Sequence, residues 1–200
     1  MKKLVLIGIL LSLVFVPSAY AQQKYALGVG NVALKVDYFR FTDSNMGDLN
    51  LQNGLFLGIE GYVGTFLPNL YFGIETGWAG TSGDWKYWDV KADLSSTYVP
   101  IEFNVKYAFE LSPSFVLDLG SGLSINYFDI EETVGNWSTS SNDWLFGGQF
   151  FADADFKFGS SWFVGANIKY QVTQDIRLNG IDTETSASNF RVGGQLGYMF

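Results

Sequence analysis

The feature that most constrains this sequence is a two-residue alternation of apolar and polar side chains, which recurs from residue 25 onward. It is clearest in 54–66, where Leu57 and Ile59 share one face and Glu60 lies on the other. Alternation at period two is typical of a β-strand whose two faces meet different surroundings. No helical period persists after residue 25, so we expect an all-β fold.

Eight alternating runs follow one another, and the connections between them alternate between long and short. We expect strands at 25–41, 54–66, 71–79, 97–109, 115–128, 143–158, 162–173 and 188–200. The long connections are 42–53, 80–96, 129–142 and 174–187, and the short ones are 67–70, 110–114 and 159–161. Even-stranded membrane barrels have short periplasmic turns and longer outer loops. The pattern therefore predicts an eight-stranded antiparallel up-and-down transmembrane β-barrel.

Charged residues occur singly, on one face of the expected strands, while the other face is continuously apolar. A soluble sandwich or lipocalin-type barrel has the reverse arrangement, with an apolar inside and a polar outside. If the apolar faces contact lipid, the charges lie in the lumen and need partners of opposite sign. We expect an interior charge network of Glu60, Glu75, Glu102, Lys106, Asp118, Asp153, Asp155, Lys157, Lys169 and Arg191.

Aromatic residues gather near the ends of the expected strands. Tyr71, Phe72, Trp162 and Phe163 lie toward the short turns, and Tyr98 lies with others toward the long loops. Two aromatic girdles at the two membrane interfaces would explain this distribution. The general preference of aromatic residues for strands is the alternative explanation.

The first 21 residues have the features of a secretory signal peptide. Lys2 and Lys3 precede an apolar run, 4–16, that is short for a membrane span, and an A-x-A site ends at Ala21. We expect cleavage there, which leaves residues 22–200 as the barrel domain in the cell outer membrane of a Gram-negative cell.

With the apolar faces outward and the ending GYMF, the sequence resembles the small eight-stranded outer-membrane barrels of the OmpX and OmpA-transmembrane type. The resemblance is one of pattern over 22–200. It implies that the last strand carries the signal read by the barrel-assembly machinery. The residues that match this signal are Val192, Leu196, Tyr198 and Phe200. Gly194 departs from it, because a larger apolar residue is more usual there.

Composition argues against several functions. The chain contains no His and no Cys. The absence of His removes the commonest general base and the commonest metal ligand. We expect no enzymatic activity, cofactor or metal. A net charge of −8 also makes nucleic acid an unsuitable partner. A lumen of eight strands is filled by its own side chains, which disfavours a wide pore.

The long loops are the remaining candidates for function. They are acidic, and they carry an aromatic group that could bind a surface ligand: Trp85, Tyr87, Trp88 and Trp137. Residues so near a membrane could instead rest on its interface. We expect a structural or cell-surface interaction role, with outer-membrane lipid and lipopolysaccharide as surroundings. A narrow channel or conduit for small hydrophobic molecules, a soluble lipocalin-like carrier and a lipid-modifying enzyme are the alternatives.

Overall fold

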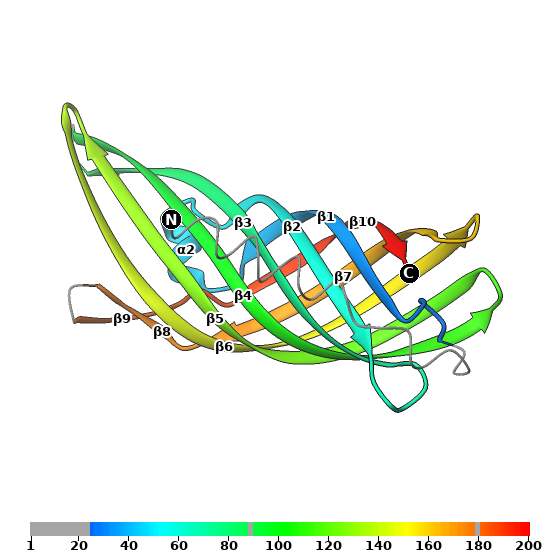
Figure 1. Cartoon of the computed structure of the whole chain (residues 1–200). Helices are drawn as coiled ribbons and strands as arrows, with labels where there is room; N and C mark the ends of the chain where they lie inside the picture. Colours follow the sequence, from blue (N-terminus) through cyan, green and yellow to red (C-terminus); the bar gives the residue numbers. More distant parts are fainter. Residues whose placement is uncertain (1–24, 88–89, 179–180) are drawn as a thin grey trace, which may run out of the picture.

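Eight strands of the computed structural model close into an antiparallel barrel, in the order β1, β10, β7, β6, β5, β4, β3, β2 (Figure 1). The structure describes residues 25–87, 90–178 and 181–200. The barrel strands are β1 (Gly30–Phe41), β2 (Asn53–Gly64), β3 (Leu70–Tyr87), β4 (Val90–Ser112), β5 (Phe115–Val134), β6 (Trp137–Phe158), β7 (Trp162–Thr173) and β10 (Asn189–Met199). The expected eight-stranded barrel is confirmed.

Three further elements belong to the long connections. A short helix, α2 (Ser44–Asp48), joins β1 to β2, and a separate hairpin of β8 (Asp175–Leu178) and β9 (Ile181–Ser186) follows β7. Asp43 caps the helix, because its side chain accepts a hydrogen bond from the backbone nitrogen of Asn45 at 3.0 Å. Among the described residues, no helix is both long and apolar enough to cross a membrane.

The first and last strands close the barrel. They pair from Asn31 opposite Met199 to Phe41 opposite Asn189. Phe200 extends this seam, since its backbone nitrogen donates to the carbonyl of Gly30 at 2.9 Å. The wall therefore has no unpaired edge where lipid would meet it, as a membrane barrel requires.

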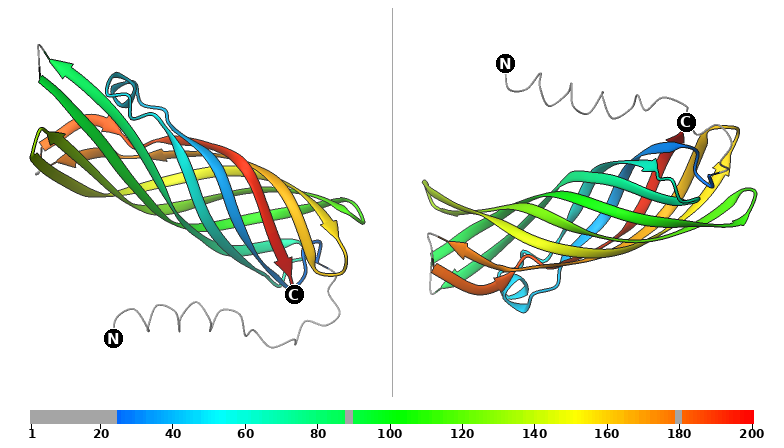
Figure 2. Two further views of the ribbon diagram at one scale, coloured as in Figure 1. Left: turned by 90° about the horizontal axis from the view of Figure 1, so that it is seen from above. Right: turned by 60° about the horizontal axis from the view of Figure 1, so that its bottom comes forward.

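Two of the expected long loops, 80–96 and 129–142, are wrong as loops, because their described residues mostly continue the barrel strands, and the expected loop 174–187 contains the β8–β9 hairpin. The β3–β4 pairing continues to Tyr87 opposite Val90, and the β5–β6 pairing to Val134 opposite Trp137. The two hairpins also pair with each other, as far as Asp93 opposite Thr133. Together they form one four-stranded sheet, here called the projecting sheet, which extends beyond the barrel at one end (Figures 1 and 2).

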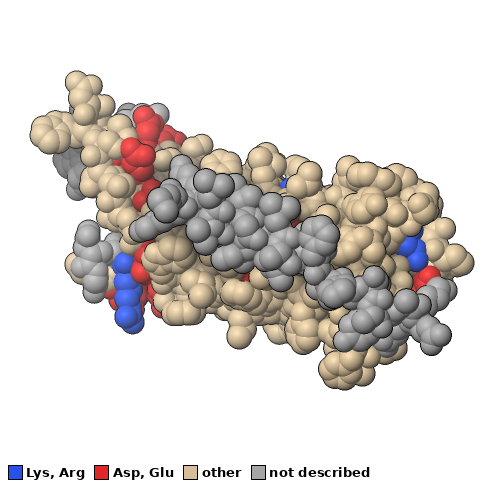
Figure 3. Space-filling view, in the orientation of Figure 1, with Lys and Arg blue, Asp and Glu red and all other residues tan. Residues whose placement is uncertain are grey.

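The apolar strand faces point outward. Leu57, Phe103 and Phe150 are 47%, 51% and 71% exposed, whereas Glu60 and Arg191 are 1% and 0% exposed. In Figure 3 the visible barrel wall is almost free of charge, and acidic residues gather at the end with the projecting sheet. This arrangement is the inverse of a soluble carrier and excludes the lipocalin-like alternative.

Apolar clusters fill the barrel at both ends. The hairpin-end cluster includes Phe41, Phe56 and Phe128 from the wall and Met46 from α2. The turn-end cluster includes Leu27, Tyr62, Tyr71 and Phe163. Tyr71, Tyr98 and Phe163 are therefore lumen residues, which corrects their expected place in the outer girdles. Each lies at an inward position of its strand, and position near a strand end does not reveal that direction.

The β3–β4 ladder is interrupted once within the barrel. Pairing stops at Thr76 opposite Ile101 and resumes at Ala79 opposite Tyr98. Pro100 lies in the gap and has no backbone N–H to donate across it. The hydroxyl of Thr76 donates instead to the carbonyl of Pro100 at 2.7 Å.

Candidate functional site

The middle of the lumen contains a row of three glutamates on neighbouring strands. Glu60 of β2 stands opposite Glu75 of β3, and Glu75 stands opposite Glu102 of β4. Like charges directly opposite each other in a ladder repel. All three are at most 1% exposed, so solvent does not weaken that repulsion and cations must offset it.

The cations come from the two ends of the chain. Arg191 of β10 and Lys169 of β7 are themselves register partners, and both reach the glutamate row. The Arg191 guanidinium contacts Glu102 and lies 3.1 Å from Glu75, and the Lys169 amine lies 2.6 Å from Glu75. Lys35 of β1 completes the arrangement, with its amine 2.8 Å from Glu60.

A second group of charges lies on β4, β5 and β6. Asp118 and Asp153 are register partners, and Lys106 lies 2.6 Å from Asp118 and 3.9 Å from Asp153. The Lys106 amine also lies 4.2 Å from the centroid of the Tyr62 ring, a cation–π contact. Asp155 accepts a hydrogen bond from the side-chain amide of Gln195 at 2.6 Å.

The structure thus brings nine of the ten expected interior charges into the sealed lumen, together with two that the sequence analysis did not include. Lys35 and Asp37 alternate with Leu34 and Val36 on β1 and are 2% exposed. This alternation was the sequence signal that could have identified Lys35 and Asp37 as lumen residues. The buried charges of the described chain comprise seven acids, Asp37, Glu60, Glu75, Glu102, Asp118, Asp153 and Asp155, and four bases, Lys35, Lys106, Lys169 and Arg191.

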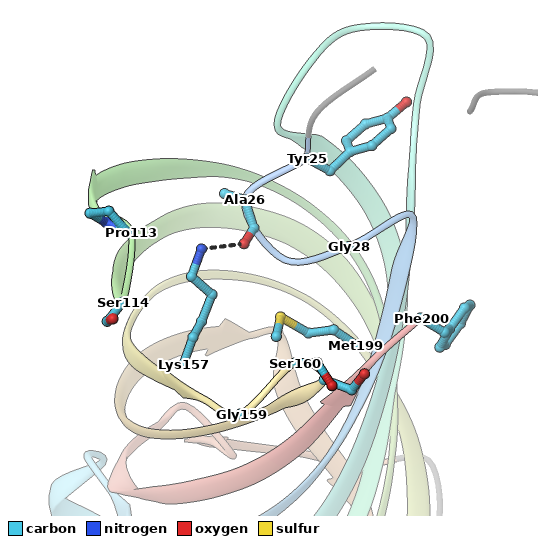
Figure 4. A pocket seen from close by; sticks show the side chains of 11 residues that line it. Tyr25, Ala26, Gly28, Pro113, Ser114, Lys157, Gly159, Ser160, Met199 and Phe200 are labelled. Carbon is cyan, nitrogen blue, oxygen red and sulfur yellow. Dashed lines mark hydrogen bonds between the residues drawn. The ribbon is translucent and has the colours of Figure 1, made fainter. Parts of the chain in front are cut away.

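The tenth residue, Lys157, lies apart from this network, at the short-turn mouth. Its amine lies 3.1 Å from Glu110 and donates to the carbonyl of Ala26 at 3.0 Å (Figure 4). A depression of about 410 Å³ opens beside it, between the N-terminal segment and the turns at Pro113 and Ser160.

The segment 25–29 closes this mouth. Leu27 is fully buried, and its backbone nitrogen donates to the hydroxyl of Tyr71 at 2.9 Å. The backbone nitrogen of Ala26 donates to the side chain of Asn69 at 2.8 Å. The expected first strand therefore begins at Gly30 rather than at residue 25, because these backbone groups bond to side chains of the mouth.

The projecting sheet, unlike the lumen, presents an exposed aromatic side chain. Trp137, at the tip of the β5–β6 hairpin, is 85% exposed. Trp85 and Tyr87 lie on the last residues of β3, where the backbone alone is described, and Trp88 lies outside the described residues. The structure therefore does not bring the four predicted surface aromatics together in one described site.

The residues of the predicted assembly signal share the outer face of β10. Val192, Leu196 and Tyr198 are 42%, 47% and 41% exposed, and Phe200 follows the strand with 43% exposure. Gly194 occupies the same face between Val192 and Leu196. Their reading by the barrel-assembly machinery stays a prediction.

In the part of the chain that the structure describes, the lumen carboxylates are arranged as ion pairs. Among the described residues, no cluster of three or more acidic side chains is arranged to hold a metal ion. The lumen carboxylates contact amines, a guanidinium and amides, which is the geometry of structural ion pairs.

Comparisons with known proteins cover most of the chain. The family model described as "outer membrane protein beta-barrel domain" matches residues 7–200. A search among curated proteins found no match.

Several solved structures share the fold. Neisserial surface protein A is 13% identical, with 86% of this chain and 98% of that chain covered and a TM-score of 0.57. A major outer membrane protein of Thermus thermophilus is 11% identical, with 84% and 99% covered and a TM-score of 0.55. Outer membrane protein OprG of Pseudomonas aeruginosa is 13% identical, with 88% and 100% covered and a TM-score of 0.53.

Proposed function

The chain belongs to the family of outer membrane protein beta-barrel domains, and from this premise we propose that it acts at the cell surface through its projecting sheet. The barrel lies in the cell outer membrane. In barrels of this kind the short turns face the periplasm and the long connections face outward. The projecting sheet is then extracellular, and the mouth closed by segment 25–29 is periplasmic.

The observation that carries the proposal is the length of the projecting sheet beyond the outer girdle. Trp78 and Trp144 are 47% and 54% exposed on the outer wall, as expected for the outer aromatic girdle. The hairpin tip at Trp137 lies seven residues beyond Trp144, and at roughly 3.3 Å per residue this is about 23 Å along the strand. Regular paired structure that continues for this length beyond the outer girdle serves a purpose other than spanning the membrane.

The two apolar clusters argue against the alternative of a narrow channel. The hairpin-end cluster contains Phe39, Phe41 and Leu145, each fully buried, and the turn-end cluster contains fully buried Leu27. Water and ions would have to pass both clusters. A barrel of eight strands leaves little room for such a path.

We also propose that the protein is not an enzyme. Its sequence has no His, and the buried carboxylates are engaged with Lys and Arg rather than with a nucleophile. Outer-membrane lipid and lipopolysaccharide are the proposed surroundings of the wall, and the barrel-assembly machinery is its proposed partner during insertion.

Cells that produce the protein provide the test. We expect them to attach to a target surface better than cells that produce a variant in which a two-residue turn replaces 131–140. Heat-modifiable gel mobility checks that the shortened barrel folds. Equal attachment by both cell types, or stepwise conductance of the intact protein in planar bilayers, would count against a surface role.

A further inference from the structure

One face of the β5–β6 hairpin continues the lumen side of the barrel above the hairpin-end cluster. Alternation along the strands places Val134, Trp137, Glu132 and Thr139 on the face that continues the lumen side, and these four residues are here called the hairpin ledge. Val134 is the register partner of Trp137, and Glu132 is the register partner of Thr139. The next pair down, Ile130 and Ser141, marks the point where Ile130 packs against the hairpin-end cluster.

From the chemistry of this ledge, we propose that it binds an uncharged oligosaccharide presented by another surface. This inference rests on the proposed function, for which it names the partner class. The indole of Trp137 is 85% exposed and makes no ring–ring or cation–π contact among the described residues. An exposed aromatic face carries partial negative charge, to which the C–H groups on one side of a pyranose ring are attracted.

Polar groups lie at the distance that a sugar requires. Thr139 is two residues from Trp137 on the same face, about 7 Å along the strand. A pyranose stacked on the indole would place its hydroxyl groups near the Thr139 hydroxyl and the half-buried Glu132 carboxylate. The Thr139 hydroxyl can donate and accept hydrogen bonds, and the Glu132 carboxylate can accept them. This combination matches sugar hydroxyls, which also act as both donors and acceptors.

Charge selects among glycans. The stretch 127–146 contains Asp129, Glu131, Glu132 and Asp143 and no Lys or Arg. A sulfated or phosphorylated glycan would meet carboxylates without a compensating cation from this hairpin, and like charges repel. An uncharged glycan avoids this repulsion.

Two other occupants fit the ledge less well. A protein interface of ordinary size buries about 800 Å² on each partner, whereas an aromatic side chain supplies only about 150–250 Å², and the neighbours of Trp137 on its own strand, 138–142, are all Ser, Thr or Asn. The membrane interface is also unsuitable, because Trp137 faces the lumen side and not the lipid side.

The test uses the full barrel in lipid nanodiscs, with maltohexaose, cellohexaose and an uncharged galactose hexamer as probes and a heparin hexasaccharide as the anionic comparison. Binding is followed by saturation-transfer NMR. We expect at least one uncharged probe to bind saturably and the heparin fragment not to bind. Trp137→Ala should weaken binding at least tenfold, Trp137→Phe by less, and Thr139→Val about threefold. Ile181→Ala removes another well-exposed apolar side chain, from the β8–β9 hairpin, and should change nothing.

Three results would overturn the sugar assignment. They are no saturable binding of any uncharged probe, binding that Trp137→Ala leaves unchanged, and tighter binding of the heparin fragment. Measurements of cell attachment distinguish a wrong sugar assignment from a wrong proposed function. Attachment that depends on 131–140 but survives enzymatic removal of target glycans contradicts the sugar ligand alone, whereas attachment indifferent to 131–140 contradicts the surface role.

Discussion

Arg191 shows how single side chains hold this lumen together. It is fully buried, contacts two glutamates from neighbouring strands, and stacks its guanidinium 4.4 Å from the centroid of the Phe56 ring. A planar, always charged group can serve both carboxylates at once, which a lysine amine does less well. Loss of one member of a buried ion pair leaves the remaining charges without compensation.

We therefore predict that Arg191→Met lowers the free energy of unfolding by about 3–5 kcal/mol, measured by urea unfolding in lipid vesicles. Arg40→Met is the matched control, because Arg40 is exposed on the outer surface of β1 and donates to the side chain of Gln52 at 3.1 Å. That variant should stay within about 0.5 kcal/mol of the parent. Equal unfolding midpoints for the two variants would contradict the assignment.

Two glycines of β10 provide a second residue-scale prediction. A Cβ added to inward-facing Gly197 would lie 2.0 Å from the Phe163 ring, whereas one on outward-facing Gly194 would come no closer than 3.5 Å to the carbonyl oxygen of Gly165. Gly197→Ala should therefore destabilise the barrel by about 1–3 kcal/mol through overpacking, and Gly194→Ala should not. Heat-modifiable gel mobility over a temperature series measures both. A larger loss for Gly194→Ala would be inconsistent with this packing.

At this scale strand periodicity identified nine of the charged side chains that point inward, whereas the aromatics Tyr71, Tyr98 and Phe163 were wrongly assigned to the girdles. The sequence analysis omitted Lys35 and Asp37 from the charge network, although both alternate with the apolar residues Leu34 and Val36. The partners of each charge were not accessible to it. Arg191 and Glu75 are 116 residues apart, and only closure of the barrel determines that they meet.

Among the elements, β4 is an extended, well-paired strand whose ladder with β3 has a gap inside the barrel. Pro100 interrupts its ladder with β3, and Thr76 covers the defect with a side-chain hydrogen bond. An unmade backbone bond in a membrane wall is costly, because no water replaces it. The defect therefore marks the weakest part of this pairing.

Pro100→Val should stabilise the barrel by about 1 kcal/mol, because it restores a donor opposite Gly77 and fits strand geometry. Urea unfolding in vesicles measures the gain. Thr76→Val should have the opposite sign, since it removes the covering bond while preserving shape. A destabilised Pro100→Val barrel would show that the proline fills a packing need instead.

Element boundaries were predicted well where one face meets lipid and poorly where neither does. The strands 54–66 and 162–173 agree closely with β2 and β7 because their apolar face is continuous. The segments 80–96 and 129–142 were expected to be loops because serine, threonine and acidic residues give no apolar period. Backbone hydrogen bonds hold these strands together, and the side-chain pattern carries little information about backbone hydrogen bonds.

At the scale of the whole molecule, apolar clusters close the lumen at both ends, so we expect the barrel not to conduct ions. The intact barrel should give no conductance steps in planar bilayers, and a variant lacking 25–28 should remain silent because the hairpin-end cluster still closes the lumen. Conductance steps are expected only when this deletion is combined with Phe41→Ser and Phe128→Ser, because these substitutions let water enter the hairpin-end cluster. Steps from the single deletion would show that the hairpin-end cluster does not seal.

The placement of charge along the chain has one further consequence, for biogenesis. Three of the four buried bases lie on β1, β7 and β10, while six of the seven buried acids lie on β2 to β6. A half-finished, open sheet of β2 to β6 would carry six of these acids with Lys106 as their one buried base among the described residues, on a face suited to neither water nor hydrocarbon. The final meeting of head and tail brings Lys35, Lys169 and Arg191 to these acids and reduces the imbalance, so the electrostatics of this protein favour entry into the bilayer and ring formation as a single, concerted event.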